Sequence, residues 1–272
     1  MKQLEAFQAT VLDYYHAHGR HELPWRQLNA DGELDPYHVL VSEIMLQQTQ
    51  VPRVIPKFQE FIAAFPDIQT LSAALLADVL RLWSGLGYNR RAKFLWQAAH
   101  AVVEQYGGVL PRTTRELVTL PGIGPNTAGA ILTYAYNLPV PFIETNVRTV
   151  FIHHFFPDRE GVDDREILDL VATALPDDPR TWYWALMDYG THLKQTIGNL
   201  NKLSKQYTVQ STFSGSKRQV RGQVLRALSV RAYDFPALET IIADTRLAAV
   251  LDDLLAEGMI TQNGMSYKLP GA

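Results

Sequence analysis

A turn with two closely spaced glycines constrains the fold of this chain more than any other feature. Residues 120–130 read LPGIGPNTAGA, and the apolar spacing on either side predicts helices over residues 115–120 and 127–136. Gly122 and Gly124 permit a tight connection because glycine adopts positive φ without strain. Backbone N–H groups at the start of the second helix then form a site for an anion such as phosphate. The alternative is a corner between two helices that binds nothing.

The chain before about residue 258 is predicted to be helical, since sustained strand alternation is absent there. Short loops with glycine or proline separate the helical stretches. The expected fold class is therefore all-α for most of the length. The predicted helices cover residues 2–18, 37–48, 54–65, 71–83, 90–106, 115–120, 127–136, 146–155, 164–175 and 180–191.

A change of composition sets off the C-terminal part of the chain. Residues 194–217 are rich in Ser, Thr, Asn, Lys and Gln, which is typical of a linker between a helical domain at 1–193 and a small domain at 218–272. In the small domain, three helical stretches precede residues 259–269, where an Asn-Gly pair predicts a β-hairpin. Three helices and a hairpin describe a winged-helix-like domain, and a generic packing domain is the alternative.

The charge of the chain is unevenly distributed. The formal net charge is −3, but residues 191–233 carry eight Lys and Arg and no acidic residue, so this segment is +8 and the remainder is −11. A basic segment of this kind favours a polyanion as partner, with Lys217, Arg218 and Arg221 as candidate contacts. A solvated linker is the alternative.

The sequence contains no cysteine. Disulfides, cysteine-ligated zinc, iron–sulfur clusters and a thiol nucleophile are therefore excluded. The eight histidines show no spacing typical of a metal site, so we expect neither a metal nor another cofactor.

Three motifs occur in the order found in one family. LPGIGPNTAGAI at residues 120–131 resembles the helix-hairpin-helix of the DNA glycosylase superfamily that includes endonuclease III and MutY. SEIMLQQTQV at residues 42–51 resembles the MutY segment around the catalytic glutamate, and WSGLGY at residues 83–88 resembles the MutY loop that enters the duplex. The resemblance extends over residues 23–190. It implies a two-lobed, all-α helix-hairpin-helix DNA glycosylase fold with the active site between the lobes.

Glu43 is the candidate general acid. On a helix its neighbours at i−4 and i+3 are Val39 and Leu46, and a carboxyl group beside apolar side chains has a raised pKa. Such a group donates a proton near neutral pH, which assists the departure of a purine from its sugar. The resemblance implies this role, and the alternative is an ordinary glutamate on a helix surface.

Glu144 is the second candidate catalytic carboxylate. The segment FIETNVR at residues 142–148 has glutamate where the family has an aspartate. The resemblance implies that this group stabilises positive charge on the sugar or assists attack by water, as paired carboxylates do in glycoside hydrolysis. The alternative is a glutamate that interacts with the N-terminus of the following helix.

The resemblance also implies roles around the target base, which must leave the base stack. Gln48 and Tyr88 are expected to fill the vacated space; for Tyr88 the alternative is an aromatic side chain that closes a loop. Asn126 stands where bifunctional relatives have a lysine that forms a Schiff base, so we expect hydrolysis without strand cleavage. The expected base pocket is Arg26, Leu46, Asn126, Asn146 and Asp188, and the expected DNA contacts are Gln48, Thr49, Tyr88, Gly122, Gly124, Thr127, Lys217, Arg218 and Arg221.

Two departures from the family concern DNA binding. Relatives usually carry four cysteines of an iron–sulfur cluster after a segment like residues 185–190, whereas here Lys194 falls near the first expected cysteine. The basic segment is expected to supply phosphate contacts instead. MutY usually ends in a Nudix-like domain that recognises 8-oxoguanine, and the short tail of this chain differs from it.

The leading prediction is a monomeric, monofunctional glycosylase that excises adenine opposite guanine or 8-oxoguanine from duplex DNA. Two alternatives stay open: excision of thymine or uracil opposite guanine, and DNA binding without catalysis on the same fold. The N-terminus lacks the pattern of a signal peptide, and no apolar run approaches about 20 residues. A cytoplasmic protein is therefore expected, associated with the nucleoid if the source is prokaryotic.

Overall fold

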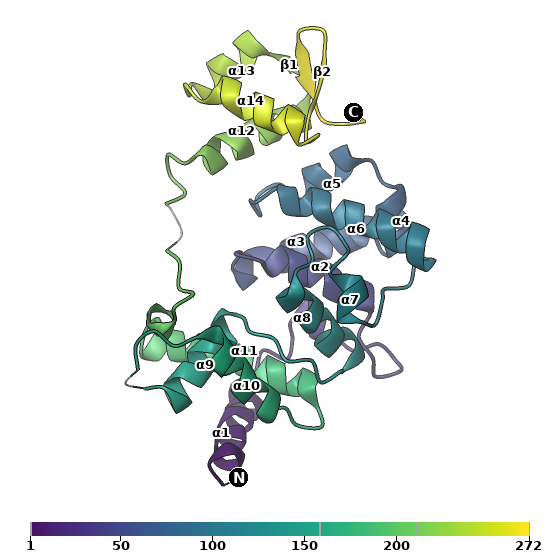
Figure 1. The fold of residues 1–272 in the computed structure, drawn as a ribbon. Helices are drawn as coiled ribbons and strands as arrows, with labels where there is room; N and C mark the ends of the chain where they lie inside the picture. Colours follow the sequence, from purple (N-terminus) through teal and green to yellow (C-terminus); the bar gives the residue numbers. More distant parts are fainter. Residues whose placement is uncertain (1, 158, 210–211, 272) are drawn as a thin grey trace. The chain divides into compact units, whose positions relative to one another are not determined.

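The computed structural model describes residues 2–157, 159–209 and 212–271, and Figure 1 shows the course of the chain. The chain forms two compact units. Unit 1 comprises Met1–Leu40, Arg112–Thr119 and Ile123–Val209, and unit 2 comprises Val41–Pro111, Leu120–Gly122 and Gln210–Ala272. The first crossing between them lies inside helix α2 (Pro36–Leu46).

Unit 1 is helical and its core forms where α1 and α9 pack on α11. Phe7 of α1 makes edge-to-face contacts with Phe151 of α9 and Trp182 of α11, and all three side chains are buried. Such ring pairs stabilise a core beyond the area they bury. The elements of unit 1 are α1 (Lys2–His18), 3₁₀-helix η1 (Pro24–Arg26), α7 (Thr114–Leu117), α8 (Pro125–Tyr136), α9 (Thr145–Phe155), α10 (Asp164–Thr173), α11 (Pro179–Thr196) and 3₁₀-helix η2 (Leu200–Leu203).

Unit 2 is organised around α6, which packs against α4 and α5. Leu95, Ala98 and Val102 form the buried stripe of α6, with the spacing of an amphipathic helix. The helix ends at Tyr106, and the next residue, Gly107, adopts the left-handed conformation (φ +61°) that closes many helices. The first elements of unit 2 are α3 (Val51–Ala64), α4 (Ile68–Ala73), α5 (Leu76–Leu82) and α6 (Arg90–Tyr106).

The single helix predicted over residues 71–83 is wrong. The structure has two helices there, α4 and α5, because residues 74 and 75 are extended. The carbonyl oxygen of Ala74 accepts a hydrogen bond from the indole N–H of Trp96 at 2.9 Å, and Asp67 caps the start of α4. Apolar spacing continues across the break, so periodicity alone does not reveal it. The helix predicted over residues 37–48 ends earlier, at Leu46, since Gln48 has positive φ.

The first half of the predicted linker packs against unit 1. Helix α11 continues to Thr196, and η2 follows it. Asn201 is buried; its amide donates to the carbonyl of Thr145 (3.2 Å) and the hydroxyl of Thr149 (2.9 Å), and its oxygen accepts from Arg148 (3.3 Å). These bonds attach η2 to α9. Residues 210–211, further along the predicted linker, lie outside the described residues.

Residues 217–269, which we call the C-terminal module, contain three helices and a three-stranded antiparallel sheet of order β1-β3-β2. The predicted β-hairpin is confirmed: Asn263 pairs with Ser266, and Gly264 in the connection has φ +59°. The short strand β1, which joins the hairpin, was not predicted because two residues carry no alternation. The elements are α12 (Lys217–Val230), β1 (Tyr233–Asp234), α13 (Phe235–Ile242), α14 (Leu247–Ala256), β2 (Thr261–Asn263) and β3 (Ser266–Lys268).

Among the described residues, every helix falls short of the length and hydrophobicity needed to cross a bilayer.

His154 of α9 is expected to make the stability of unit 1 depend on pH. Its ring lies 4.9 Å from that of Phe7, and its Nε2 is 3.2 Å from the hydroxyl of Tyr189. Burial and the neighbouring His153 lower the pKa of His154 from 6.5 to about 4. Between these values the unfolded chain binds more protons than the fold, so stability is lost as pH falls through this window. After allowance for partial exposure, we expect a loss on the order of 1–2 kcal/mol between pH 7 and 4.5.

The variant His154→Gln tests this expectation because glutamine keeps a polar group near Tyr189 and does not titrate. Urea denaturation at pH 7 and pH 4.5 should show a smaller difference in unfolding free energy than the wild type. His16→Gln, at an exposed position on α1, is the control and should respond to pH as the wild type does. An unchanged pH response in His154→Gln would contradict the assignment.

Candidate active site

The glycine turn connects α7 to α8 as the sequence predicts. Gly122 has φ +79°, and a Cβ atom there would lie 2.8 Å from the Cβ of Phe94. Gly124 is the N-cap of α8, followed by Pro125 in the first turn. A helix start directs its first N–H groups outward, and Gly124, Pro125 and Asn126 are all exposed there. The turn therefore has the positive φ at Gly122 that the sequence predicts, and the phosphate contact stays a prediction.

Asn126 lies beside the segment that leads to Glu144. Its side-chain oxygen accepts a hydrogen bond from the backbone N–H of Ile143 at 3.5 Å. Thr127, the next residue, is half-buried on α8. This hydrogen bond links the start of α8 to the backbone just before Glu144, the second candidate carboxylate.

Glu144 is the N-cap of α9. Its Oε1 accepts hydrogen bonds from the backbone N–H groups of Asn146 (2.5 Å) and Val147 (3.0 Å). Its Oε2 accepts from the hydroxyl of Thr145 at 3.2 Å. The extra methylene relative to aspartate is accommodated because the side chain folds back over its own helix start. The interaction with the helix N-terminus, named as an alternative above, is therefore present in the structure.

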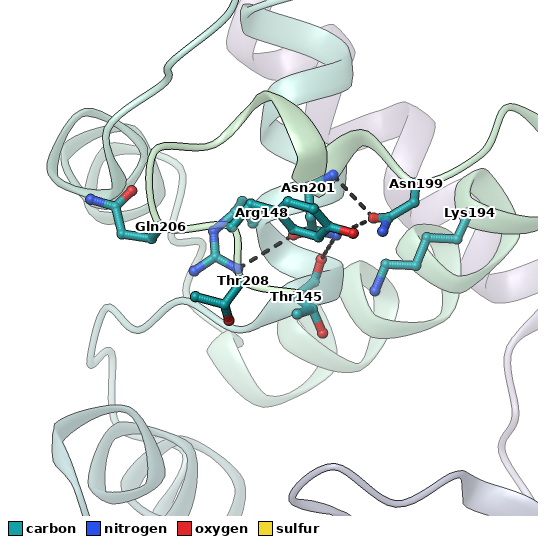
Figure 2. Close-up of a pocket in the computed structure, with 8 residues that line it drawn as sticks. Thr145, Arg148, Lys194, Asn199, Asn201, Gln206 and Thr208 are labelled. Atoms are coloured by element: carbon teal, nitrogen blue, oxygen red, sulfur yellow. Dashed lines mark hydrogen bonds between the residues drawn. The ribbon is translucent and has the colours of Figure 1, made fainter. Parts of the chain in front are cut away.

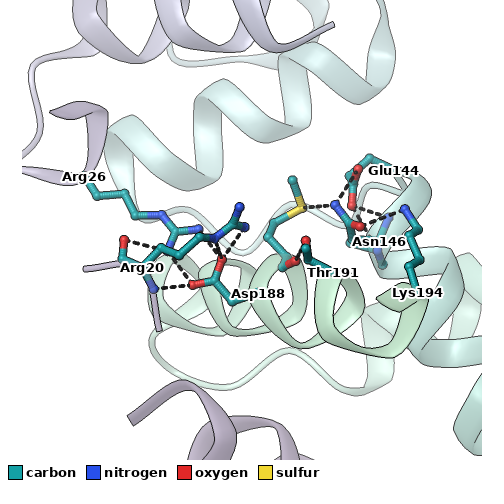
Figure 3. Close-up of polar contacts among 9 residues, drawn as sticks. Arg20, Arg26, Glu144, Asn146, Asp188, Thr191 and Lys194 are labelled. Atoms are coloured by element: carbon teal, nitrogen blue, oxygen red, sulfur yellow. Dashed lines mark hydrogen bonds and ion pairs between the residues drawn. The ribbon is translucent and has the colours of Figure 1, made fainter. Parts of the chain in front are cut away.

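Lys194 joins Glu144 and Asn146 in one cluster, which Figure 3 shows. The ammonium group of Lys194 donates to Oδ1 of Asn146 at 2.7 Å. Burial lowers the pKa of Lys194, and the charge of Glu144 opposes this shift. Sequence reasoning did not identify Lys194 as a site residue, although its place near an expected cysteine was noted.

Close packing of α11 against α9 fixes this cluster. A Cβ atom at Gly190 would lie 2.6 Å from the carbonyl oxygen of Asn146, so only glycine fits at this crossing. Thr191 follows on the same helix and donates its hydroxyl to the carbonyl of Met187 at 2.8 Å.

A second cluster on α11 holds Asp188 between two arginines (Figure 3). Arg26 donates to both carboxylate oxygens of Asp188, at 2.8 and 3.0 Å. Arg20 adds a bond from its Nε (2.7 Å) and one from its backbone N–H (2.8 Å). Burial raises the pKa of Asp188, but the hydrogen bonds and charges of the arginines outweigh it and hold the pKa below the usual range. Arg26 and Asp188 were expected at the base pocket; the structure brings them together and adds Arg20.

A cavity of about 470 Å³ that is lined by residues of polar types opens in unit 1 next to the Glu144 cluster. Lys194 of that cluster lines the cavity, and so does Thr145, which follows Glu144; Figure 2 shows both side chains. Arg148 on its wall forms a bidentate ion pair with Asp164, at 2.8 and 2.6 Å. The other lining residues are Asn199, Asn201, Gln206, Tyr207 and Thr208.

In unit 2, Glu43 lies on α2 with a half-buried side chain. Val39, one turn earlier, is 2% exposed, and Leu46, which ends the helix, is half-buried. Val39, Glu43 and Leu46 therefore lie on one helix, as the apolar spacing predicts. The proton donation assigned to Glu43 stays a prediction.

Gln48 and Tyr88 both lie in turns with unusual backbone conformations. Their φ angles are +55° and +46°, which side chains other than glycine seldom adopt. Strain of this kind persists where the surroundings enforce it and is frequent at functional sites. Thr49 donates weakly to the carbonyl of Leu86 at 3.4 Å, so the two turns lie side by side in unit 2.

Arg91 of α6 connects the two turns, and sequence reasoning missed it. Its Nη1 donates to the carbonyls of Ile44, Met45 and Gln47 at 2.7, 2.9 and 2.6 Å. Its Nη2 donates to the hydroxyl of Thr49 (3.0 Å) and the carbonyl of Gly87 (3.2 Å). Burial lowers the pKa of Arg91 to about 10. An arginine in the first turn of an amphipathic helix gives no sequence signal that distinguishes it from a surface charge.

Replacing Arg91 with methionine should destabilise the protein by about 2 kcal/mol, since the carbonyls that end α2 lose their donor. Arg91→Lys should recover only part of this stability because an ammonium group cannot bond both turns with the geometry of a guanidinium. Urea denaturation measures both effects. Arg115→Met, at an exposed position on α7, is the matched control. A cost as small as that of the control would show that the two turns do not depend on Arg91.

The three basic residues expected to contact DNA in the C-terminal module lie on α12. Lys217 pairs with Asp253 at 2.5 Å, and Arg221 pairs with Glu257. Arg218 donates to the hydroxyl of Tyr88. In the described part of the chain, no group of three or more His, Cys, Asp or Glu side chains has the arrangement of a metal site.

Comparisons with known proteins show which family the sequence resembles. Residues 41–171 match the model of the HhH-GPD superfamily base excision DNA repair proteins. An adenine DNA glycosylase of Mycolicibacterium smegmatis is 34% identical over 274 residues, which cover 93% of this chain and 92% of the relative. An adenine DNA glycosylase of Buchnera aphidicola is 43% identical over 149 residues, and the match spans 55% of this chain and 41% of the relative.

Among solved structures, a thermostable thymine-DNA glycosylase matches with a TM-score of 0.60 at 23% identity, over 70% of this chain and 86% of that chain. The fold is therefore that of the helix-hairpin-helix DNA glycosylases, which confirms the predicted fold class. The similarity to the mycobacterial relative extends beyond the superfamily segment into the tail. The chain belongs to the adenine DNA glycosylase family of the HhH-GPD superfamily.

Proposed function

We propose that this protein is a monofunctional DNA glycosylase of base excision repair that hydrolyses the N-glycosidic bond of adenine mispaired with guanine or 8-oxoguanine. The observation that carries the proposal is the 34% identity to an adenine DNA glycosylase over 93% of the chain. The candidate residues, including Glu43 and Glu144, lie within the matched length. The chain spans about two-fifths of the length of the Buchnera relative, so activity and substrate are part of the proposal.

The proposed reaction begins when the target adenine leaves the base stack and Gln48 and Tyr88 enter the duplex. Glu43 donates its proton to a ring nitrogen of adenine. The bond between the sugar C1′ and the base then breaks, and its electron pair goes to the protonated base. Water adds to C1′ and loses a proton, which gives an abasic site. Base-pocket contacts are proposed for Arg26, Leu46, Asn126, Asn146 and Asp188.

Glu144 is proposed to stabilise the positive charge that develops on the sugar. Its capping bonds to Asn146 and Val147 support this role because they hold a carboxylate in one place at the start of α9. A fixed charge aimed at a developing charge lowers the barrier without reorganisation. The cluster with Lys194 gives Asn146 a defined orientation beside it.

Glu144→Gln should therefore lower the single-turnover rate of adenine excision by about 10²-fold, since the amide keeps an acceptor and loses the charge. Glu144→Asp should stay within about 10-fold of the wild type because aspartate is a good N-cap and keeps the charge. Asp178→Asn, which alters the N-cap of α11, is the control for a purely structural effect. If Glu144→Gln loses stability and keeps its rate, Glu144 is a cap alone.

The proposal includes double-stranded DNA as the partner, with phosphates bound at Gly122, Gly124 and Thr127. The C-terminal module is proposed to be winged-helix-like, and its helices and hairpin support this. We further propose a monomer that is cytoplasmic and, in a prokaryote, associated with the nucleoid. Asn126 at the Schiff-base position supports hydrolysis without strand cleavage.

The test is single-turnover incubation of the full chain with labelled duplexes that contain A·G, A·8-oxoG, T·G or U·G, each analysed with and without alkali. A matched A·T duplex is the control. Alkali-dependent cutting of the two adenine mismatches is expected. Cutting of T·G or U·G alone would assign the protein to pyrimidines, and cutting without alkali would overturn the inference from Asn126. Binding without any cutting would leave a DNA-binding protein of this fold.

A further inference from the structure

The C-terminal module contacts the turn that carries Tyr88. Arg218, in the first turn of α12, donates a hydrogen bond to the hydroxyl of Tyr88, and its guanidinium lies 5.1 Å from the centroid of the Tyr88 ring. The guanidinium of Arg91 lies 5.6 Å from the same ring. Two cations from two helices therefore hold one aromatic side chain, and such contacts gain strength where the groups are partly desolvated. Both Arg218 and Tyr88 are half-buried.

Within unit 2, further hydrogen bonds join the module to the helices that precede and follow the Tyr88 turn in the sequence. Arg81 of α5, which precedes the turn in the sequence, donates to the carbonyl of Ser229 at 3.2 Å. Arg90 and Lys93 of α6 follow the turn. Arg90 donates a hydrogen bond to the side chain of Glu257, and Lys93 donates one to the backbone carbonyl of Glu257. Arg221 of α12 bonds the same Glu257 carboxylate.

Glu257 is thus the central acceptor of this anchor. Its side chain is 15% exposed. Burial raises the pKa of Glu257, but the hydrogen bonds from Arg90 and Arg221 outweigh it and hold the pKa below the usual range. The carboxylate is therefore charged at neutral pH, and the anchor fixes the start of α12 with respect to α6. Arg218 is placed on Tyr88 as a consequence.

We propose that the C-terminal module is a positioning element for Tyr88 and that it acts through Arg218. The inference rests on the proposed function, in which Tyr88 enters the duplex. A side chain that already has its working orientation loses less conformational freedom on binding, so preorganisation increases the rate and the affinity. The positive φ of Tyr88 is consistent with this, because its turn needs external contacts to stay populated.

Hydrogen exchange in the free, full-length protein tests the contact without any substrate. In Arg218→Ala, the backbone amides of residues 84–88 should exchange at least about 3-fold faster than in the wild type, because local opening becomes easier. Arg226→Ala removes the same charge from an exposed position on the same helix and should leave this exchange unchanged. Equal exchange in Arg218→Ala and the wild type would overturn the proposal.

A double-mutant cycle with Tyr88→Phe then tests the consequence for the reaction. Arg218→Ala and Tyr88→Phe should each slow single-turnover excision at A·G by about 3- to 10-fold, which corresponds to the net contribution of one typical intramolecular hydrogen bond. The double variant should be no slower than the slower single variant, since both changes remove one contact. Arg218→Lys should restore little, whereas Arg226→Ala combined with Tyr88→Phe should be additive.

The proposal would be overturned if the effects of Arg218→Ala and Tyr88→Phe were additive and Arg218→Ala reduced the salt dependence of DNA binding by about one phosphate contact. Arg218 would then be a contact to the DNA backbone alone. A wild type that excises no base would contradict the proposed function instead. The exchange measurement decides the Arg218 contact in that case too, so the two failures are distinguishable.

Discussion

Replacing Glu43 with glutamine should lower the single-turnover rate of adenine excision by about 10³-fold, because an amide cannot supply the proton that the leaving base requires. The two side chains have nearly the same shape, and the half-buried position on α2 accepts either. Affinity for the A·8-oxoG duplex should change by less than about 3-fold, since the lost interaction is made in the transition state. Gel-shift titration and quenched-flow excision measure the two quantities on one preparation.

Glu104→Gln is the matched control for this experiment, because Glu104 is exposed on α6 and the substitution is identical. It should keep the wild-type rate. A Glu43→Gln rate within 10-fold of the wild type would remove Glu43 from the role of general acid. Excision of thymine or uracil that persists in Glu43→Gln would point to the pyrimidine alternative, since these bases depend less on ring protonation.

Replacing Asp188 with asparagine should lower the free energy of unfolding by about 3–5 kcal/mol, the usual cost of removing one member of a buried ion cluster. The side chains of Asp188 and Arg26 are 2% and 4% exposed. Without the carboxylate, the buried guanidinium of Arg26 loses its charged partner. The cost is therefore that of an uncompensated buried cation as well as that of the lost hydrogen bonds.

Urea denaturation followed by tryptophan fluorescence measures this change. Glu60→Gln breaks the exposed pair between Glu60 and Lys57 and should change stability by less than about 1 kcal/mol. A loss of excision by Asp188→Asn without loss of stability would support the base-pocket role of Asp188 rather than a structural one. Stability equal to that of the control variant would contradict the buried cluster.

Local motifs made much of the fold and part of the site predictable. The two glycines at 122 and 124 define the turn before α8 because few other residues fit it, and Gly122 has the expected positive φ. Apolar periodicity identified most helices, including α6 with its ends. It failed across residues 74–75, where a hydrogen bond from Trp96 on another helix determines the break.

The residues that the sequence did not reveal act over long separations. Arg20 and Asp188 meet although 168 positions separate them, and nothing near Arg20 distinguishes it from a surface arginine. Arg91 and Lys194 acquire their roles only when α6 and α11 are packed against other segments. For Glu144 the sequence left two readings open, and the capping bonds show that the helix interaction is real while the catalytic role stays a proposal.

The bonds of Arg91 also bear on the order of events when the protein meets its substrate. One guanidinium holds the carbonyl before Gln48 and the carbonyl before Tyr88, so a displacement of either turn pulls on a shared donor. If Gln48 and Tyr88 enter the duplex as proposed, we expect their insertion to be one concerted step, because a half-inserted intermediate would break bonds of the buried Arg91 side chain.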